Sequence, residues 1–254
     1  MKIKRTYKYR IYPNREQRTC LEEWLETCRV LYNDCLTERR DAWSVAHKSI
    51  GYYDQANQLK EIKTFDEDLK EVHSQVLQDV LKRADKAFKN FFRRVSGKRK
   101  EKAGYPRYKP RSRYSSFTYP QSGFKFSEDG KLILSKIGSV NIKKHRDIPG
   151  SANIKTCTIE KDLDRWYACF SVEIEVEEPS EDQDKDITNP IGIDLGISHL
   201  ITLSNGETED NPKYLSKSEE KLKRKQRKLS KSKKGSNNRS KKRFELAKTH
   251  RKVR

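Results

Sequence analysis

The chain has 254 residues and a formal net charge of +20, because 57 Lys and Arg stand against 37 Asp and Glu. Charged residues make up 37% of it, where an ordinary globular domain has about a quarter. No apolar run approaches the ~20 residues that span a bilayer. The polar N-terminus also lacks the apolar core of a signal peptide. We therefore expect a cytoplasmic protein that binds a polyanion.

The positive charge is confined to three tracts of the chain. Residues 213–254 carry a net charge of +16, residues 81–114 carry +12 and residues 1–18 carry +6, while the remainder carries −14. A nucleic-acid backbone favours such segregation, because each Lys or Arg that neutralises a phosphate releases a counterion. The alternative is three solvated surfaces that only keep the protein soluble.

The first hundred or so residues predict one strand followed by helices. Residues 3–12 alternate between apolar and basic side chains, which predicts a strand with a basic outer face. Asn14 begins a capping-box pattern, and apolar residues spaced by three and four then predict a helix to about His47. A short helix near 54–62 follows. A longer helix over 72–95 has an apolar stripe and a basic face.

A basic-aromatic loop and several strands come next. Residues 97–120 interleave basic and aromatic side chains around three prolines. This pattern favours an extended loop suited to phosphate contacts and base stacking, unless the segment is only a solvated linker. Turn signals separate five short predicted strands, at 115–120, 131–134, 137–142, 154–160 and 166–176. With the first strand they would form a small β-barrel or sandwich, into which the helices are inserted.

The stretch 191–197 reads Ile-Gly-Ile-Asp-Leu-Gly-Ile and predicts a strand and a turn, with a second strand at 200–203. Asp194, in an otherwise apolar strand, needs a metal or hydrogen-bond donors if it is buried. It could be the first-strand carboxylate of a ribonuclease H-like nuclease, part of the phosphate loop of a kinase or actin-like ATPase, or an Asp that caps its own turn. The residues that follow predict two basic helices around a Gly-Ser break, which argues against an ATPase.

Six motifs follow one another in a distinctive order along the chain. They are Tyr-Arg-Ile-Tyr-Pro-Asn (9–14), Phe-Lys-Asn-Phe-Phe-Arg (88–93), Gly-Tyr-Pro-Arg-Tyr (104–108), Gly-Ile-Asp-Leu-Gly-Ile (192–197), Asn-Pro-Lys-Tyr (211–214) and the basic run 223–236. In this order they resemble the TnpB (OrfB) family of insertion-sequence proteins, which are relatives of type V CRISPR effectors.

The resemblance implies an α+β multidomain protein that acts as an RNA-guided, Mg²⁺-dependent DNA endonuclease. Residues 1–13 and 115–176 would form a β-barrel wedge domain, and residues 14–114 an inserted helical recognition domain with the basic loop. An acidic linker (177–189) would lead to the start of an incomplete ribonuclease H-like (RuvC) domain at 190–254. The implied partners are a guide RNA transcribed from the transposon end and target double-stranded DNA. No membrane is implied, and a nucleoid-associated, prokaryotic location is expected.

The resemblance also assigns site residues. Asp194 matches the first catalytic carboxylate and would be a Mg²⁺ ligand. The nucleic-acid-binding candidates are basic residues of the three tracts: Lys4, Lys8, Arg10, Lys89, Arg93, Arg94, Arg107, Lys109, Arg111, Arg113, Lys223, Arg224, Arg227, Lys228, Lys231, Lys234 and Arg239. The candidates for reading target DNA are Tyr53, Asn57, Ser74, Gln75, Gln78, Ser115 and Ser116. Glutamine suits that role because it can pair bidentately with adenine.

The match to the family is incomplete. The family's catalytic Glu, four-cysteine zinc insertion and final catalytic Asp have no counterpart, and the five cysteines lack Cys-x-x-Cys spacing, so zinc is not expected. We therefore expect a C-terminally truncated chain that binds guide RNA and target DNA without cleaving. Three alternatives remain open: a piece of an active nuclease, a non-enzymatic repressor or competitor derived from a truncated transposase gene, and a basic RNA-binding protein without a guide.

Overall fold

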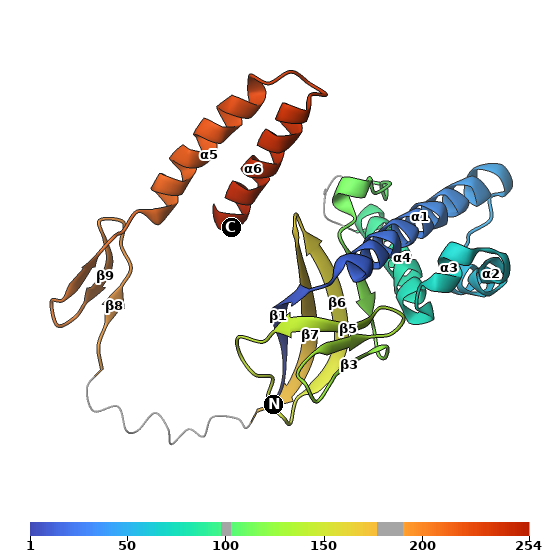
Figure 1. Ribbon diagram of the computed structural model, residues 1–254, viewed down its shortest axis with the longest axis horizontal. Helices are drawn as coiled ribbons and strands as arrows, with labels where there is room; N and C mark the ends of the chain where they lie inside the picture. Colours follow the sequence, from blue (N-terminus) through green and yellow to red (C-terminus); the bar gives the residue numbers. More distant parts are fainter. Residues whose placement is uncertain (98–102, 177–189, 254) are drawn as a thin grey trace. The chain divides into compact units, whose positions relative to one another are not determined.

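The computed structural model describes residues 1–97, 103–176 and 190–253. The chain divides into two compact units, Met1–Val176 and Glu177–Arg254 (Figure 1). The predicted acidic linker at 177–189 and residues 98–102 of the basic loop lie outside the described residues. Within the described residues, no helix is long and apolar enough to cross a membrane.

The first unit is built on a curled, seven-stranded antiparallel sheet with the order β2-β6-β7-β1-β5-β4-β3. The strands are β1 (Lys2–Tyr12), β2 (Ser116–Tyr119), β3 (Phe124–Phe126), β4 (Leu132–Leu134), β5 (Gly138–Lys143), β6 (Asn153–Asp162) and β7 (Arg165–Glu175). The alternation predicted for the first strand is confirmed, because Tyr7, Tyr9 and Ile11 are buried while Lys4 and Lys8 are exposed.

The sheet curls without a hydrogen-bonded ladder between its two edge strands, β2 and β3, as far as the described residues show. The predicted barrel is therefore an open, curled sheet. Aromatic rings pack within it: the centroid of Phe170 lies 5.9 Å from Tyr9 and 5.1 Å from Phe126. At the start of β1 and the end of β7, the Met1 amino group donates to the Val176 carbonyl at 2.8 Å, and the Val176 N–H donates to the Met1 carbonyl at 2.9 Å.

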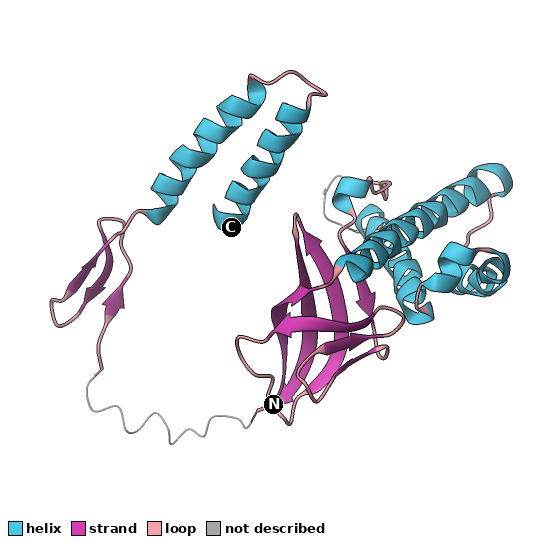
Figure 2. Cartoon of the chain, in the orientation of Figure 1, coloured by secondary structure: helices cyan, strands magenta, loops and turns pink. Residues whose placement is uncertain are grey.

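Four helices pack together beside the β2 edge of the sheet (Figures 1 and 2). They are α1 (Arg15–Ala46), α2 (Tyr52–Phe65), α3 (Glu67–Glu71) and α4 (Ser74–Val95). The predicted capping box starts α1, since the Asn14 side chain accepts from the Gln17 N–H and the Gln17 side chain accepts from the Asn14 N–H. His47, with a left-handed φ of 49°, ends α1.

Several contacts from α1 and α4 fix the helices to the sheet. The Trp24 ring of α1 lies 5.5 Å from the Phe117 ring of β2. From α4, the Arg83 guanidinium donates to the Ser116 carbonyl at 2.8 Å and to the Thr118 hydroxyl at 2.6 Å. The predicted apolar stripe of α4 is buried from Val76 to Phe88, but its C-terminal members Phe92 and Val95 are each 59% exposed. The opposite, basic face of α4 is thus held facing outward next to the start of β2.

The second unit contains a three-stranded antiparallel sheet and a helical hairpin. Its elements are β8 (Ile193–Asp194), β9 (His199–Leu203), β10 (Thr208–Asp210), α5 (Tyr214–Ser230) and α6 (Asn237–Val253). The two predicted basic helices are confirmed, and Gly235 lies between them with a φ of 84°. The Arg239 guanidinium closes the hairpin by donating to the carbonyls of Leu229 and Ser232, at 2.9 and 2.8 Å, at the C-terminal end of α5.

Candidate nucleic-acid interface

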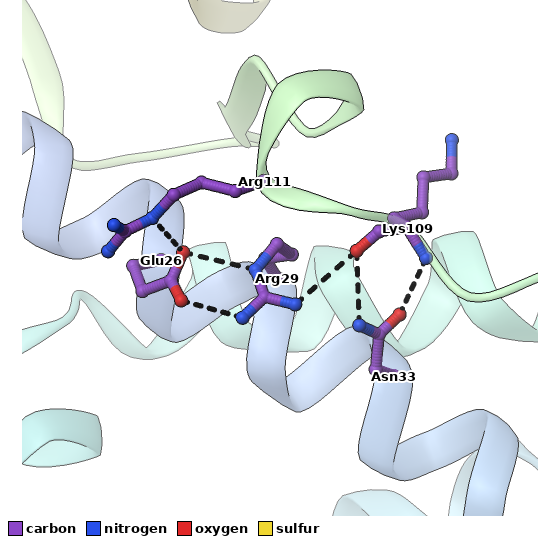
Figure 3. A network of polar contacts seen from close by, with 5 residues as sticks. All are labelled: Glu26, Arg29, Asn33, Lys109 and Arg111. Carbon is purple, nitrogen blue, oxygen red and sulfur yellow. Dashed lines mark hydrogen bonds and ion pairs between the residues drawn. The ribbon is translucent and has the colours of Figure 1, made fainter. Parts of the chain in front are cut away.

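The described part of the basic loop is fixed along α1. The Asn33 side-chain oxygen accepts a hydrogen bond from the Lys109 N–H at 2.8 Å, and its amide nitrogen donates one to the Lys109 carbonyl at 3.1 Å (Figure 3). The hydroxyls of Thr37 and Tyr108 lie 3.1 Å apart, within hydrogen-bond distance. The solvated-linker interpretation therefore does not hold for the residues around Lys109, because α1 dictates their backbone conformation.

Glu26 of α1 provides a second anchor for the loop. Its carboxylate accepts from Arg29 at 2.6 and 3.0 Å and from Arg111 Nε at 3.0 Å (Figure 3). The hydrogen bond from Arg29, followed by that from Arg111, lowers the pKa of Glu26 to about 2 against the opposing effect of burial. The carboxylate is therefore ionised at neutral pH. Arg111, a predicted phosphate ligand, is engaged in holding the loop in place.

A cationic cavity of about 320 Å³ lies between α4 and the loop, and we call it the α4 cavity. Its lining residues are Tyr32, Arg83, Lys86, Ala87, Asn90, Lys109, Arg113, Tyr114, Ser115 and Ser116. None of these residues carries a carboxylate. Within the described part of the chain, no ion pair engages Lys86, Lys109 or Arg113. Four cations thus line one cavity, and three of them have no ion pair with a described residue, which suits the cavity to a phosphate.

The Lys109 side chain points away from Asn33 (Figure 3), and its ammonium group lies over the Tyr32 ring of α1, 5.7 Å from the centroid. The backbone of Lys109 is held by α1, so its ammonium group is presented by an anchored segment. Lys86 and Asn90 of the α4 cavity were not among the predicted site residues. The signal that could have found them is their position on α4, because Lys86 lies four residues after Lys82 and Asn90 lies three residues before Arg93.

The predicted readers of target DNA fall into two groups. Ser115 and Ser116 line the α4 cavity, and Gln78 is exposed on the outward face of α4, with no hydrogen bond to another described residue. Tyr53 and Asn57 are exposed on α2, and the Tyr53 side chain is 80% accessible.

Ser74 and Gln75, by contrast, have partners within the chain. The Ser74 hydroxyl accepts from Lys63 Nζ at 2.8 Å, and Gln75 Oε1 accepts from the N–H and hydroxyl of Ser122 at 3.1 and 3.0 Å. These two side chains fasten the N-terminal end of α4 to α2 and to the loop that follows β2. Gln78 is therefore the glutamine of α4 that is available to a base edge.

The lysines of β1 are largely matched by glutamates on the adjacent strand β7 and on β6 beyond it. Lys8 pairs with Glu160 at 2.6 Å and Lys2 with Glu175 at 3.1 Å. Lys4 lies opposite Glu173 in the β1–β7 register. Arg10 lies over the Tyr12 ring, 4.7 Å from its centroid. The N-terminal tract thus offers less free positive charge than its sequence indicates.

The other basic candidates are mostly exposed. Lys89 pairs with Asp85 at 2.8 Å, while Arg93, Arg94 and Arg107 are exposed. The basic residues of α5 and the turn after it are also exposed: Lys223, Arg224, Arg227, Lys228, Lys231 and Lys234. Arg239 differs from them because its guanidinium caps α5.

Asp194 lies on β8 opposite Thr202, and it is exposed. The predicted strand, turn and second strand are confirmed as β8 and β9, but β8 has only two residues, and Ile193 and Leu195 beside Asp194 are 65% and 75% exposed. Residues 190–200 around it are all exposed, and residues 201–203 of β9 are half-buried. Across the described ranges there is no group of three His, Cys, Asp or Glu side chains that could hold a metal. A lone exposed carboxylate does not fit a Mg²⁺ pair.

The five cysteines are free thiols. Cys28, Cys35 and Cys157 are buried, and Cys20 and Cys169 are half-buried. Burial raises the pKa of Cys28 and of Cys35 to about 12. These thiols pack as small apolar groups within the first unit.

Two family models match the ends of the chain. Residues 170–254 match a family described as "Probable transposase" (OrfB_IS605), and residues 1–48 match its "Helix-turn-helix domain". Over residues 1–48 the structure has the strand β1 followed by the single helix α1.

Relatives match almost the whole chain. A protein of Streptomyces pristinaespiralis, named as a candidate RNA-guided DNA endonuclease, is 34% identical over 99% of this chain and 60% of its own length. The protein InsQ of Escherichia coli K12, with the same description, is 30% identical over 98% of this chain and 60% of its own length. The chain thus spans about three fifths of these curated relatives.

A cryo-EM structure of a Cas12f1–sgRNA–target DNA complex gives a TM-score of 0.49 at 10% identity, over 98% of this chain and 75% of that chain. The likeness to the family rests instead on the sequence matches. With family matches at both ends and two relatives along nearly its full length, the chain is similar to proteins of the OrfB_IS605 transposase family.

Proposed function

We propose that the chain binds guide RNA and guide-matched duplex DNA, and that the α4 cavity is a phosphate site in this recognition. The observation that carries the proposal is the convergence of Lys86, Lys109 and Arg113 on one cavity without a carboxylate in its lining. The names of the two relatives support the same function. Phosphate contacts of this kind fix the register of a nucleic acid and supply much of its affinity.

Base reading would fall to the exposed polar residues beside this cavity. Gln78 projects from the outward face of α4 and has an amide that can pair with an adenine edge. Ser115 and Ser116 offer hydroxyls at the cavity itself. We propose that Tyr53 and Asn57 of α2 contribute from the neighbouring helix, and that Ser74 and Gln75 act by positioning α4.

The second unit would be the beginning of a RuvC-like domain, with Asp194 as its first catalytic carboxylate and the basic face of α5 as an RNA contact. The polypeptide 1–254 is proposed to bind without cleaving, because the single exposed carboxylate of Asp194 does not fit a Mg²⁺ site. Such a binder could act as a repressor or competitor. The guide RNA is proposed to be transcribed from the transposon end.

The salt dependence of binding tests the phosphate site. The variant Lys86→Gln/Lys109→Gln/Arg113→Gln should reduce the slope of log K against log salt for duplex DNA by about 2–3, since each phosphate contact contributes about 0.9. The control Lys60→Gln/Lys125→Gln/Lys131→Gln changes net charge equally at exposed positions away from the cavity. Equal slopes for both variants would mean that the α4 cavity is not the phosphate site.

Cleavage is tested separately. Purified 1–254, loaded with its co-purifying RNA, should retain a matched duplex and leave it intact in Mg²⁺. Cutting that Asp194→Ala abolishes would overturn the non-cleaving proposal. Sequencing the co-purified RNA distinguishes a guided protein, which retains one defined species, from a general RNA binder, which retains a mixture.

A further inference from the structure

A second cavity, of about 570 Å³, lies between the C-terminal halves of α1 and α4, and we call it the aromatic pocket. Aromatic side chains from three elements line it: Trp43 of α1, Phe88, Phe91 and Phe92 of α4, and Tyr105 of the loop. Trp43 and Phe92 are each 59% exposed and Tyr105 is 45% exposed. Its size is typical of pockets that hold small planar ligands.

One buried polar side chain, Arg39, lies among the residues that line the aromatic pocket, and it is only 8% exposed. Its Nε donates a hydrogen bond to the Gln55 side-chain oxygen at 2.9 Å, and its Nη1 donates one to the Asp85 carboxylate at 3.1 Å. Its Nη2 is buried and has no hydrogen-bond partner. A buried donor without an acceptor is costly, so the pocket is suited to an occupant that brings an acceptor.

The rim of the aromatic pocket is positively charged. Lys48 and Arg40 are among the lining residues, and no Asp or Glu is. Arg40 also lies over the Tyr108 ring, 5.7 Å from its centroid, and pairs with Asp41 at 2.8 Å. Lys48 has no ion pair with any described residue. The pocket therefore combines aromatic surfaces, an unsatisfied donor and a cationic edge.

We infer that the aromatic pocket accepts an unstacked nucleobase from a single-stranded segment. The ring would stack on the exposed aromatics, a carbonyl or ring nitrogen would accept from Arg39 Nη2, and the adjacent phosphate would lie at Lys48. A purely apolar protein segment would leave both the donor and the cationic rim unmatched. The inference rests on the proposed nucleic-acid function and adds a site distinct from the α4 cavity.

Trp43 offers a direct probe, because the other two tryptophans, Trp24 and Trp166, are each only 2% exposed. Titration of the full chain with a hexaribonucleotide should quench tryptophan fluorescence, and a hexamer lacking all its bases should not. Phe92→Ala should weaken hexamer binding by roughly tenfold, the scale of one stacked base. Phe65→Ala, at an exposed aromatic of α2 away from the pocket, should leave binding unchanged.

Two results would overturn the inference. The first is equal binding of the base-free hexamer, which would assign the affinity to phosphates alone. The second is a dimer in sedimentation that Trp43→Ala and Phe92→Ala convert to monomer, because the pocket would then be covered by a second copy. In either case the proposed function would still stand if the triple variant of the α4 cavity reduced the slope of log K against log salt for duplex DNA. Loss of all oligonucleotide and duplex binding by wild type would instead refute both.

Discussion

The attachment of the basic loop to α1 can be tested by the substitution Asn33→Ala. Asn33 makes two hydrogen bonds to the backbone of Lys109, at 2.8 and 3.1 Å. Alanine removes both without changing the charge of the protein. It leaves three other anchors: the Glu26–Arg111 contact at 3.0 Å, the hydrogen bond from Arg29 Nη1 to the Lys109 carbonyl at 3.4 Å, and the Thr37–Tyr108 hydroxyl contact at 3.1 Å. The substitution therefore probes whether side-chain hydrogen bonds hold Lys109 and Arg113 at the α4 cavity.

The expected magnitude follows from the two bonds. A hydrogen bond contributes about 0.5–1.5 kcal/mol net, so together they stabilise the docked loop by roughly 1–3 kcal/mol. That corresponds to a shift of about 5- to 150-fold in the docked population. The global free energy of unfolding should change less, because the loop can detach while the helices and sheet stay folded.

Hydrogen exchange at the Lys109 amide is the direct measurement. The exchange rate in Asn33→Ala should rise by that factor, and tryptic cleavage after Arg107 and Arg111 should accelerate with it. Nucleic-acid affinity should fall by no more than the same factor, since the cations lose their preorganisation. Asn33→Asp keeps the acceptor for the Lys109 N–H but cannot donate to the carbonyl, so its effect should be intermediate.

The control is Gln58→Ala, at an exposed position on α2, which should leave both readouts unchanged. Unchanged protection of Lys109 in Asn33→Ala would refute the reasoning, because the loop would then be held by other contacts. A loss of affinity with normal protection of Lys109 would also count against it, since preorganisation could not be the cause.

Three further predictions concern the first unit. Arg83→Met removes bonds from α4 to Asp79, Ser116 and Thr118 and should lower the unfolding free energy by about 2–3 kcal/mol in urea titration; an unchanged midpoint would contradict this. Burial, aided by the positive charges of Lys136 and Lys63, lowers the pKa of His73 below 6.5. As the pH falls, the unfolded state therefore binds the proton before the folded state does. The free energy of unfolding should then decrease as the pH drops below about 6.5. His73→Phe should remove that part of the pH dependence, and an unchanged slope would exclude His73 as its source. At pH 8, iodoacetamide should modify Cys28, Cys35 and Cys157 only after unfolding, because these thiols are buried; rapid labelling of the native protein would show that the core opens locally.

The long helices could be predicted from the sequence, because each has its own capping or periodicity signal. The capping box at Asn14 and the apolar repeat after it predicted α1 to its end, because the helix stops at Ala46 and His47 is its C-cap. The stripe from Val76 to Phe88 likewise predicted α4. The five-residue α3 and the three-residue β3 and β10 were not predicted, because so few residues show no period and such elements are stabilised by their neighbours.

The candidate site was predictable in composition but not in arrangement. The basic loop and the face of α4 are visible as charge in the sequence, yet only the fold brings Lys86 next to Lys109 and Arg113. The number of basic residues in β1 also overstates its free positive charge, because Lys8 forms an ion pair with Glu160. Asn33 and Glu26 could not be identified as anchors, because their partners are 76 and 85 residues away in the chain.

The reciprocal hydrogen bonds between Met1 and Val176 have a practical consequence. They place the first residue of the first unit beside its last, so a tag, dye or fusion partner joined to the N-terminus would sit next to the point where the chain departs for the second unit. The charged amino group is itself a donor there, so acetylation or extension would replace it with an amide. A reporter intended to leave that junction undisturbed is better placed in the turn at Asp129 and Gly130, which lies between β3 and β4.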